Sequence, residues 1–219
     1  MSKVFDPNPR ASGRLTGPIE VQGEIVLAHD PNAVPATAVR NVLIQSSLTE
    51  LKATGYYDRY AALIAPEVLT ELAANLGPGW IPIELALAHY EACDKMNLSA
   101  EDFALLGARV GDRVQGAVLV TSAKKKRDED FDLWNVEAQL HRMWARLFQG
   151  GSLQVVKLGP KMKLLQARGI RLNRYHYYRQ GHLAALRATH SAIGVELTTL
   201  QIASYDEAND ELTVRLGWL

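Results

Sequence analysis

The sequence lacks the features of several protein classes. It has one cysteine, Cys93, among 219 residues, so it can form no intramolecular disulfide and no metal site made of thiolates alone. It has no surplus of charge, with 24 Lys and Arg against 24 Asp and Glu, whereas general nucleic-acid binders carry a basic excess. No apolar run approaches the roughly 20 residues of a membrane-spanning helix. These absences favour a cytoplasmic protein and argue against nucleic-acid binding and a membrane span.

Familiar catalytic motifs are also missing. The chain contains no glycine-rich phosphate loop ending in Gly-Lys-Ser/Thr, no Gly-x-Gly-x-x-Gly, no His-Glu-x-x-His and no Gly-x-Ser-x-Gly. General acid–base pairs leave no sequence signature, because their members meet only in the folded chain. The sequence therefore assigns no catalytic residue and no metal ligand, although it leaves an enzyme open as an alternative.

Hydrophobic periodicity predicts a helical first two thirds and a largely extended final third. Apolar residues spaced by three and four, with glycine or proline at the ends, predict helices over residues 39–55, 57–64, 66–76, 83–96, 99–117 and 133–147. Residues 77–82 read as a rigid connector, and the charged tract 124–132 reads as a solvated loop. Alternating patterns predict strands over residues 18–27, 153–158, 162–167, 195–205 and 212–218, with one helix over residues 175–193.

The two C-terminal hairpins determine the expected fold class. Their strands must pair antiparallel, which excludes a fully parallel sheet. The sequence therefore predicts an α+β fold, with a helical bundle packed on a small antiparallel β-sheet that the C-terminal third mainly forms. We expect residues 1–17 to be a flexible N-terminal arm and residues 18–219 to be a single α+β domain of ligand-binding type. This fold requires residues 153–158 and 212–218 to share one sheet.

His89 and Cys93 form the first candidate ligand-binding pair. They are four residues apart on a predicted helix, so their side chains share a face, as two metal ligands would. No second pair at ligand spacing accompanies them, so the sequence predicts no metal site. The alternative is a buried helix in which the cysteine acts as a small apolar residue and the histidine bonds locally.

A second set of candidates lies in the last predicted helix. Tyr175, Tyr178 and His182 are spaced by three and four residues beside an apolar face, and such a stripe can line a cavity. The alternative, which we favour, places the tyrosines at the sheet edge with their hydroxyl groups in water. Trp144, in the apolar stripe of the preceding helical segment, completes the ligand-binding candidates.

Basic residues concentrate between positions 157 and 179. This local excess fits a phosphate, an acidic partner or RNA, but a solvent-facing hairpin with charged edges looks the same in sequence. Because the whole chain is neutral, we favour the second interpretation. The basic residues are Lys157, Lys161, Lys163, Arg168, Arg171, Arg174 and Arg179. Of the four tryptophans, most should be core residues, and an exposed one would mark a homodimer contact.

Several segments together resemble a known family. They are Trp80-Ile-Pro-Ile-Glu-Leu, Ala104-Leu-Leu-Gly-Ala-Arg, Leu147-Phe-Gln-Gly-Gly-Ser-Leu-Gln-Val and the final Leu212-Thr-Val-Arg-Leu-Gly-Trp218. Over residues 19–219 the chain resembles a myxobacterial domain family near the 24.2 kDa of this chain. That family is similar to the superfamily of haem nitric-oxide-binding domains, 4-vinyl reductase domains and trafficking-particle subunits.

The resemblance implies a scaffold with a pocket between helices and sheet, in which superfamily members hold haem, a small aromatic effector or an acyl chain. The haem-binding branch uses an axial histidine and a Tyr-x-Ser-x-Arg clamp, and this sequence has no such clamp. Because Cys93 stands alone, the zinc-associated cysteines of some relatives cannot be matched either. We therefore expect no cofactor, with an apolar small molecule or acyl chain as the ligand and haem as the least favoured group.

Three functional hypotheses follow. The first is a non-catalytic cytoplasmic module, homodimeric, that senses a small apolar ligand or binds a protein partner. The second is a small-molecule enzyme in which His182 or His89 acts as general base, which requires an imidazole in an open cleft beside a second polar group. The third is a haem-based gas sensor.

Overall fold

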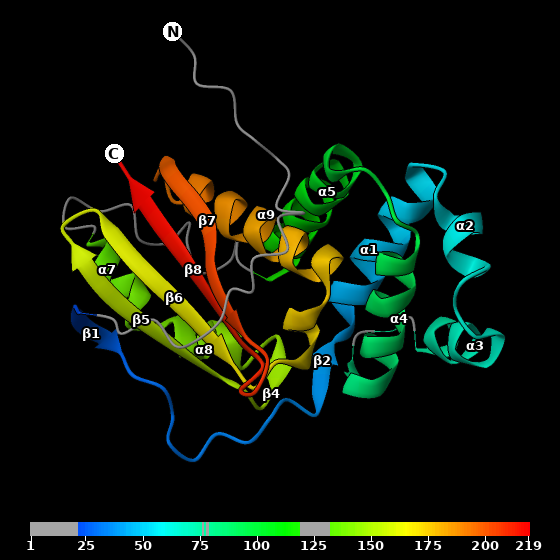
Figure 1. Cartoon of the computed structure of the whole chain (residues 1–219), viewed down its shortest axis with the longest axis horizontal. Coiled ribbons are helices and arrows are strands. Elements are labelled where there is room, and N and C mark those ends of the chain that lie inside the picture. Colours follow the sequence, from blue (N-terminus) through cyan, green and yellow to red (C-terminus); the bar gives the residue numbers. More distant parts are fainter. Residues whose placement is uncertain (1–21, 76, 78, 119–131) are drawn as a thin grey trace, which may run out of the picture.

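A computed structural model describes residues 22–75, 77, 79–118 and 132–219 (Figure 1). Within these ranges, no helix combines the length and the apolar character needed to cross a membrane. The predicted arm at residues 1–17, the start of the first predicted strand and nearly all of the loop predicted at 124–132 lie outside the described residues.

The larger sheet has five antiparallel strands and confirms the predicted α+β class (Figure 1). Its order is β1-β5-β6-β8-β7. The strands are β1 (Glu24–Leu27), β5 (Ser152–Gly159), β6 (Met162–Arg168), β7 (Leu197–Asp206) and β8 (Glu211–Trp218). Residues 153–158 and 212–218 therefore share one sheet, as the predicted fold requires. The first strand joins it at the outer edge of β5.

A second, smaller sheet has no counterpart in the prediction. It joins β2 (Ala38–Arg40), β3 (Trp80–Pro82) and β4 (Phe148–Gln149), in the order β3-β2-β4. The segment predicted as a rigid connector thus contains a strand. Pieces of two or three residues are too short to show an alternating pattern, and their pairing joins positions about 40 and 110 residues apart, so no local signal could have revealed them.

The helices of the first half lie close to their predicted positions. They are α1 (Asn41–Ala53), α2 (Tyr57–Ala61), α3 (Pro66–Ala74), α4 (Ile83–Lys95) and α5 (Ala100–Val118). The Ser99 hydroxyl accepts a hydrogen bond from the Asp102 backbone N–H at 3.1 Å and donates one to the Asp102 carboxylate at 2.7 Å. Ser99 therefore caps the start of α5, as serine commonly does at a helix N-terminus.

The helical stripe predicted for residues 133–147 is instead divided in two. Helix α7 (Leu133–Glu137) is capped by the Asp132 carboxylate, which accepts a hydrogen bond from the Trp134 N–H at 3.0 Å. After Gln139 the chain turns into α8 (Leu140–Trp144). Because α7 contacts β1 and α8 contacts β5, the break lets each short helix follow the sheet, and hydrophobic periodicity alone does not reveal such a turn.

Helix α9 (His176–Ala192) lies between the larger sheet and α5 (Figure 1). The Asp94 carboxylate of α4 accepts hydrogen bonds from the first two backbone N–H groups of α9, at 2.8 and 2.7 Å. Two glycines in α5 allow the helices to approach closely. A Cβ atom at Gly111 would lie 2.7 Å from the Ala185 nitrogen, and one at Gly107 would lie 3.0 Å from the Gln180 backbone.

Candidate functional site

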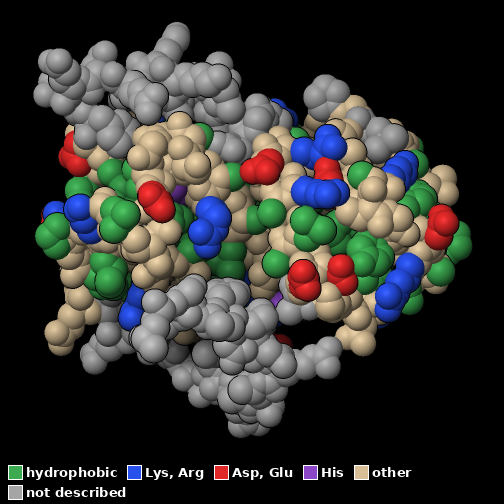
Figure 2. Space-filling model, turned by 90° about the horizontal axis from the view of Figure 1, so that it is seen from above, with side chains coloured by type: hydrophobic (Ala, Val, Ile, Leu, Met, Phe, Trp, Pro, Cys, Tyr) green, Lys and Arg blue, Asp and Glu red, His purple; other side chains and the backbone are tan. Residues whose placement is uncertain are grey.

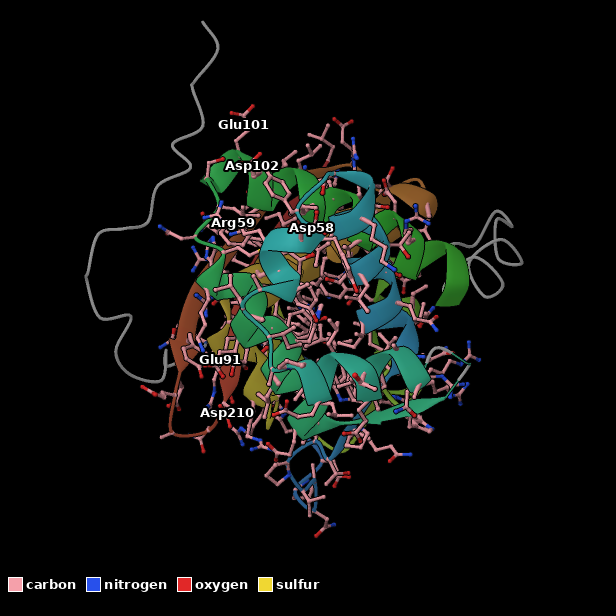
Figure 3. The ribbon with its side chains drawn as sticks, turned by 90° about the vertical axis from the view of Figure 1, so that its right-hand side faces the viewer. Asp58, Arg59, Glu91, Glu101, Asp102 and Asp210 are labelled. Atoms are coloured by element: carbon pink, nitrogen blue, oxygen red, sulfur yellow. The ribbon has the colours of Figure 1, made fainter. Side chains whose placement is uncertain are left out.

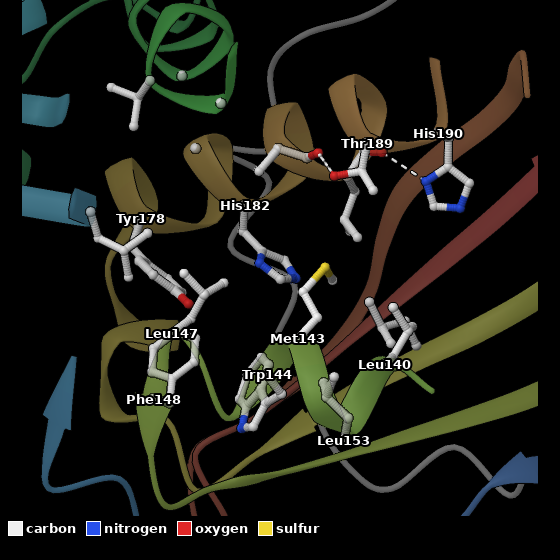
Figure 4. A pocket seen from close by; sticks show the side chains of 18 of the residues that line it. Leu140, Met143, Trp144, Leu147, Phe148, Leu153, Tyr178, His182, Thr189 and His190 are labelled. Atoms are coloured by element: carbon white, nitrogen blue, oxygen red, sulfur yellow. Dashed lines mark hydrogen bonds between the residues drawn. The ribbon is translucent and has the colours of Figure 1, made fainter. Parts of the chain in front are cut away.

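The candidate site is a cavity of about 110 Å³ beside α9, which we call the α9 cavity (Figure 4). Helices α5, α7, α8 and α9 surround it together with β5 and β6. An engineered apolar cavity of about 150 Å³ holds one benzene molecule, so this space is of the order that accommodates a small ring. Its apolar lining includes Leu43, Val110, Val136, Leu140, Met143, Trp144, Leu147, Phe148, Leu153, Leu165, Leu186 and Ile193.

Trp144, one of the residues predicted to bind a ligand, lines the cavity. Leu140, Met143 and Trp144 stand three and four residues apart on α8 and present one face to the cavity. The indole N–H of Trp144 donates to the Gly150 carbonyl at 3.2 Å, and its ring packs 4.3 Å from that of Phe148, measured between centroids. The cavity wall is therefore held in place by a hydrogen bond and by ring packing.

His182 is the polar group in the middle of this lining. In Figure 4 its imidazole and the sulfur of Met143 point toward each other. Its Nε2 atom is shielded from solvent and has no hydrogen-bond partner among the described residues. Burial lowers the pKa of His182 to about 4, so at neutral pH the ring is uncharged and one of its nitrogens carries a lone pair. That ring can accept a hydrogen bond or bind a metal centre.

Tyr178 lines the same cavity, one turn before His182, and its ring stacks on the imidazole at 6.1 Å between centroids. The phenol is buried, and this burial raises its pKa. The favoured expectation that these tyrosines keep their hydroxyl groups in water is therefore wrong for Tyr178. Packing of α9 under α5 and α4 covers a side chain that the helix pattern alone leaves at an edge.

The other end of the cavity holds a buried charged cluster that sequence reasoning did not assign to the site. Lys163 of β6 forms an ion pair with Glu137 of α7. Its Nζ atom also donates to His190 Nε2 at 3.0 Å. All three residues line the cavity, and each is less than a tenth exposed. The second carboxylate oxygen of Glu137, Oε2, has no hydrogen-bond partner among the described residues.

The two charged members of this cluster respond differently to their surroundings. Burial lowers the pKa of Lys163 below its ordinary value, and the Glu137 carboxylate opposes that effect. Burial alone would raise the pKa of Glu137, but the Lys163 ammonium and the His190 ring outweigh it and hold the pKa below its usual value. Burying such a pair costs desolvation energy, and that cost is compensated only if the remaining hydrogen-bonding positions of both groups are filled.

Sequence signals for the missed residues existed but were ambiguous. His190 follows Leu186 by four residues on α9, so the two share a face of the helix. Lys163 takes the inward position of its strand in alternation with Leu165. A basic residue at an inward position is a sign of a buried pair. Its partner, Glu137, is 26 residues away in sequence, so only the fold brings the two together.

His89 and Cys93 do not line the α9 cavity. The His89 ring bonds to the Tyr60 hydroxyl and to the Ser47 hydroxyl, both at 2.9 Å, and the Cys93 sulfur lies 3.7 Å from its Nε2 atom. Burial lowers the pKa of His89 to about 3. Both ring nitrogens are occupied, so the structure favours the interpretation of local bonding in a buried helix. No group of three His, Cys, Asp or Glu side chains suited to a metal ion occurs in the described chain.

The basic excess between residues 157 and 179 is largely neutralised by neighbours. Lys157 pairs with Glu24, Arg168 with Glu211, Arg171 with Glu84 and Arg174 with Asp210. The face shown in Figure 2 carries acidic and basic side chains interspersed. At the helical end, the labelled Asp58, Arg59, Glu91 and Glu101 point outward (Figure 3). The charged segment is therefore mostly a paired surface, apart from the buried Lys163.

Comparison with known proteins places the fold. No family model and no curated protein matches the sequence. Among solved structures, a mutant of the Fe(II) unliganded H-NOX protein from K. algicida matches with a TM-score of 0.51 at 10% identity, covering 82% of this chain and 96% of that one. The chain has an H-NOX-like fold. A Cs H-NOX mutant with an unnatural amino acid at site 5 matches with a TM-score of 0.50 at 12% identity, covering 82% and 96%.

The H-NOX-like fold corrects the expectation about cofactors. From the missing Tyr-x-Ser-x-Arg clamp we expected no cofactor and haem least of all. That expectation is wrong, because the solved structures with this fold are H-NOX proteins, one of them described with Fe(II). The donor set agrees with this correction, since a neutral imidazole with a free nitrogen in an apolar pocket is an axial ligand that haem iron takes. His182 provides such a nitrogen.

Proposed function

We propose that this chain is a non-catalytic sensor-type domain that binds its ligand in the α9 cavity, with His182 as the polar anchor. The observation that carries the proposal is the unpartnered Nε2 atom of His182, set among apolar side chains in a cavity of the described chain. Buried polar atoms without partners are rare in native proteins and call for an explanation. A ligand that bonds to this nitrogen supplies one.

Haem is a second candidate for the group that His182 binds, and the H-NOX-like fold favours it. Because the cavity of about 110 Å³ has the size of a single small ring, its walls would have to move apart to admit the macrocycle. His182 would hold the iron, and the walls formed by Trp144 and Phe148 would exclude water from the ring face. When bound, haem supplies an iron centre that can take a diatomic gas. Under this candidate the domain is a gas sensor.

A general-base role for a histidine receives less support. His89 is fully buried, with both ring nitrogens bonded. His182 has no second polar group within hydrogen-bond reach of its Nε2 atom among the described residues. A general base needs a low energetic cost of protonation near neutral pH, whereas burial lowers the pKa of His182 to about 4. The geometry therefore supports binding better than proton transfer.

We further propose a cytoplasmic location, a homodimer, a protein partner that reads the liganded state, and membership of the myxobacterial domain family within the H-NOX-like fold. The single cysteine motivates the location, and the sequence resemblance motivates the family.

The haem candidate is tested by adding haem to the purified protein and recording its absorption spectrum. We expect a Soret band in the parent protein and in the His141→Ala control, because His141 is exposed on α8 and does not line the cavity. We expect no such band in His182→Ala, and its return when imidazole is added. A parent spectrum identical to that of free haem would eliminate this candidate.

The broader proposal is tested on protein purified without additives. Native mass spectrometry should detect a retained small molecule in the parent protein and its loss in His182→Ala. If the parent protein retains nothing and His182→Ala leaves every measured binding unchanged, the cavity is not a ligand site and the proposal fails.

A further inference from the structure

We propose that the α9 cavity selects a neutral ligand with an apolar body and a hydroxyl group, and that this hydroxyl lies between Lys163 and Glu137. The inference deepens the proposed function and rests on it, because it names the chemical class of the ligand and the residues that recognise it. The ligand class follows from the hydrogen-bonding positions of the buried cluster that Lys163, Glu137 and His190 form in the cavity lining.

The protonation of His190 follows from its partners. Its Nδ1 atom lies 2.7 Å from the Leu186 carbonyl oxygen, which can only accept a hydrogen bond, so Nδ1 carries the proton. With Nδ1 protonated, Nε2 of the neutral ring is an acceptor, and it accepts from the Lys163 ammonium at 3.0 Å. The same Nε2 atom lies 3.5 Å from Glu137 Oε1, so this contact does not involve Oε2. A second N–H of the ammonium goes to Glu137 Oε1. Two of the three donors of Lys163 are thereby assigned.

Two positions remain in this cluster. Beyond those bonds, the described residues give the Lys163 ammonium one more neighbour, the Trp218 ring, whose centroid is 6.0 Å from Nζ. Glu137 is only 2% exposed, and its Oε2 atom has no partner in the described part of the chain. One donor of Lys163 and one acceptor of Glu137 are thus left over in two paired residues that both line the cavity. A hydroxyl group both accepts and donates, so it satisfies the two together.

Other head groups fit these two positions less well. A carboxylate can only accept, and it would be repelled by Glu137. An ammonium group can only donate, and it would place a second positive charge beside Lys163 in a buried region. A hydrocarbon would leave Glu137 Oε2 without a partner, which costs free energy in a buried site. The neutral hydroxyl is therefore the complementary group.

The rest of the cavity specifies the body of the ligand. His190 follows His182 by eight residues, which is about 12 Å along a helix, and the lining between them is apolar, with Leu186 of α9 and Leu140 of α8. The cavity volume of about 110 Å³ is close to that of a cavity that accepts one benzene ring. A single ring with a short hydroxyl-bearing arm is thus a suitable probe.

The test compares four probes with the same body. 2-Phenylethanol, ethylbenzene, phenylacetate and 2-phenylethylamine are titrated into the purified protein at neutral pH, and dissociation constants are measured by calorimetry. We expect 2-phenylethanol to bind about tenfold more tightly than ethylbenzene, the factor that one satisfied buried polar group contributes. The two charged probes should bind more weakly than ethylbenzene.

The double variant Glu137→Leu with Lys163→Met identifies the residues responsible. Removing both charges together leaves no lone buried charge, and buried pairs replaced in this way are often tolerated. In this variant ethylbenzene should still bind and the preference for the alcohol should disappear. The matched control is Glu84→Leu with Arg171→Met, which removes an ion pair outside the cavity lining and should retain the tenfold preference.

The outcomes separate this inference from the proposed function. Equal binding of ethylbenzene and 2-phenylethanol would mean that water fills the two positions, and it would overturn the inference while leaving the cavity as a ligand site. The inference would also be overturned if the double variant still bound 2-phenylethanol more tightly than ethylbenzene. If none of the four probes binds, or if haem binds through His182 and the double variant does not alter its affinity, the hydroxyl assignment is wrong.

Discussion

At the scale of single residues, the buried cluster of Lys163, Glu137 and His190 has the largest expected energetic effect. Its members come from β6, α7 and α9, and together they close one end of the α9 cavity. Because the charges of Lys163 and Glu137 cancel each other, removing one of them should destabilise the fold more than removing both. His182 is a second residue with an expected energetic effect, because burial keeps its imidazole neutral.

We predict that Lys163→Met alone lowers the free energy of unfolding by about 3–5 kcal/mol, because it leaves the Glu137 carboxylate buried without its partner. The double variant Glu137→Leu with Lys163→Met should unfold with a free energy equal to that of the parent or higher by about 1–4 kcal/mol. Urea titrations followed by circular dichroism measure both values. Equal losses in the single and double variants would contradict the role of the ion pair.

Protonation of His182 should make stability depend on pH. Its pKa is about 4 in the folded chain and about 6.5 in the unfolded chain. Between these two pKa values the unfolded state therefore binds more protons than the folded state. The free energy of unfolding is highest above about pH 6.5, and it falls as the pH drops toward 4. The decrease should be about 1–3 kcal/mol. This decrease in stability should be smaller in His182→Leu than in the parent protein or in the exposed control His141→Leu. Identical pH profiles of stability for all three proteins would exclude a contribution from His182.

At the scale of secondary-structure elements, the close packing of α5 on α9 positions the cavity. It depends on Gly111, where an added Cβ atom would meet the α9 backbone at 2.7 to 3.1 Å. In α9 itself, a Cβ atom at Gly181 would have no neighbour within 4 Å. The two glycines therefore have opposite expected responses to alanine.

Gly111→Ala should lower the melting temperature, because α5 and α9 must move apart to admit the methyl group. Gly181→Ala should raise the free energy of unfolding by about 0.5–1 kcal/mol, since alanine is the better helix former and meets no obstruction. Differential scanning calorimetry of both variants checks the signs. Equal stabilisation by both substitutions would show that the close approach is not required.

The elements differ in how well the sequence predicted them. The hairpin of β7 and β8 has ten- and eight-residue strands. Apolar residues alternate with polar ones along the sequence of β8, so its pattern is local and was predicted. The break between α7 and α8 was not, because Val136 and Leu140 keep helical spacing across it. The strands of the smaller sheet have three residues or fewer, and they exist only through pairing with distant segments.

At the scale of the whole molecule, oligomeric state remains a prediction. We expect a homodimer, with twice the 24.2 kDa mass of one chain. None of the four tryptophans is exposed, because Trp144 is buried and the other three are half-buried, so no exposed tryptophan marks such a contact. Light scattering after size exclusion measures the mass, and a monomer at all concentrations up to the millimolar range would refute the expectation.

The sequence by itself determined the fold class, the positions of the long helices and the antiparallel C-terminal hairpins, because periodicity and turn residues act over a few neighbouring positions. It also placed Trp144, Tyr178 and His182 among the ligand-binding candidates, and all three line the α9 cavity. Only the tertiary structure moved His89 and Cys93 away from that cavity and brought Lys163 to Glu137. Contacts between distant segments depend on how the layers pack, and that packing is a property of the whole chain rather than of any short stretch.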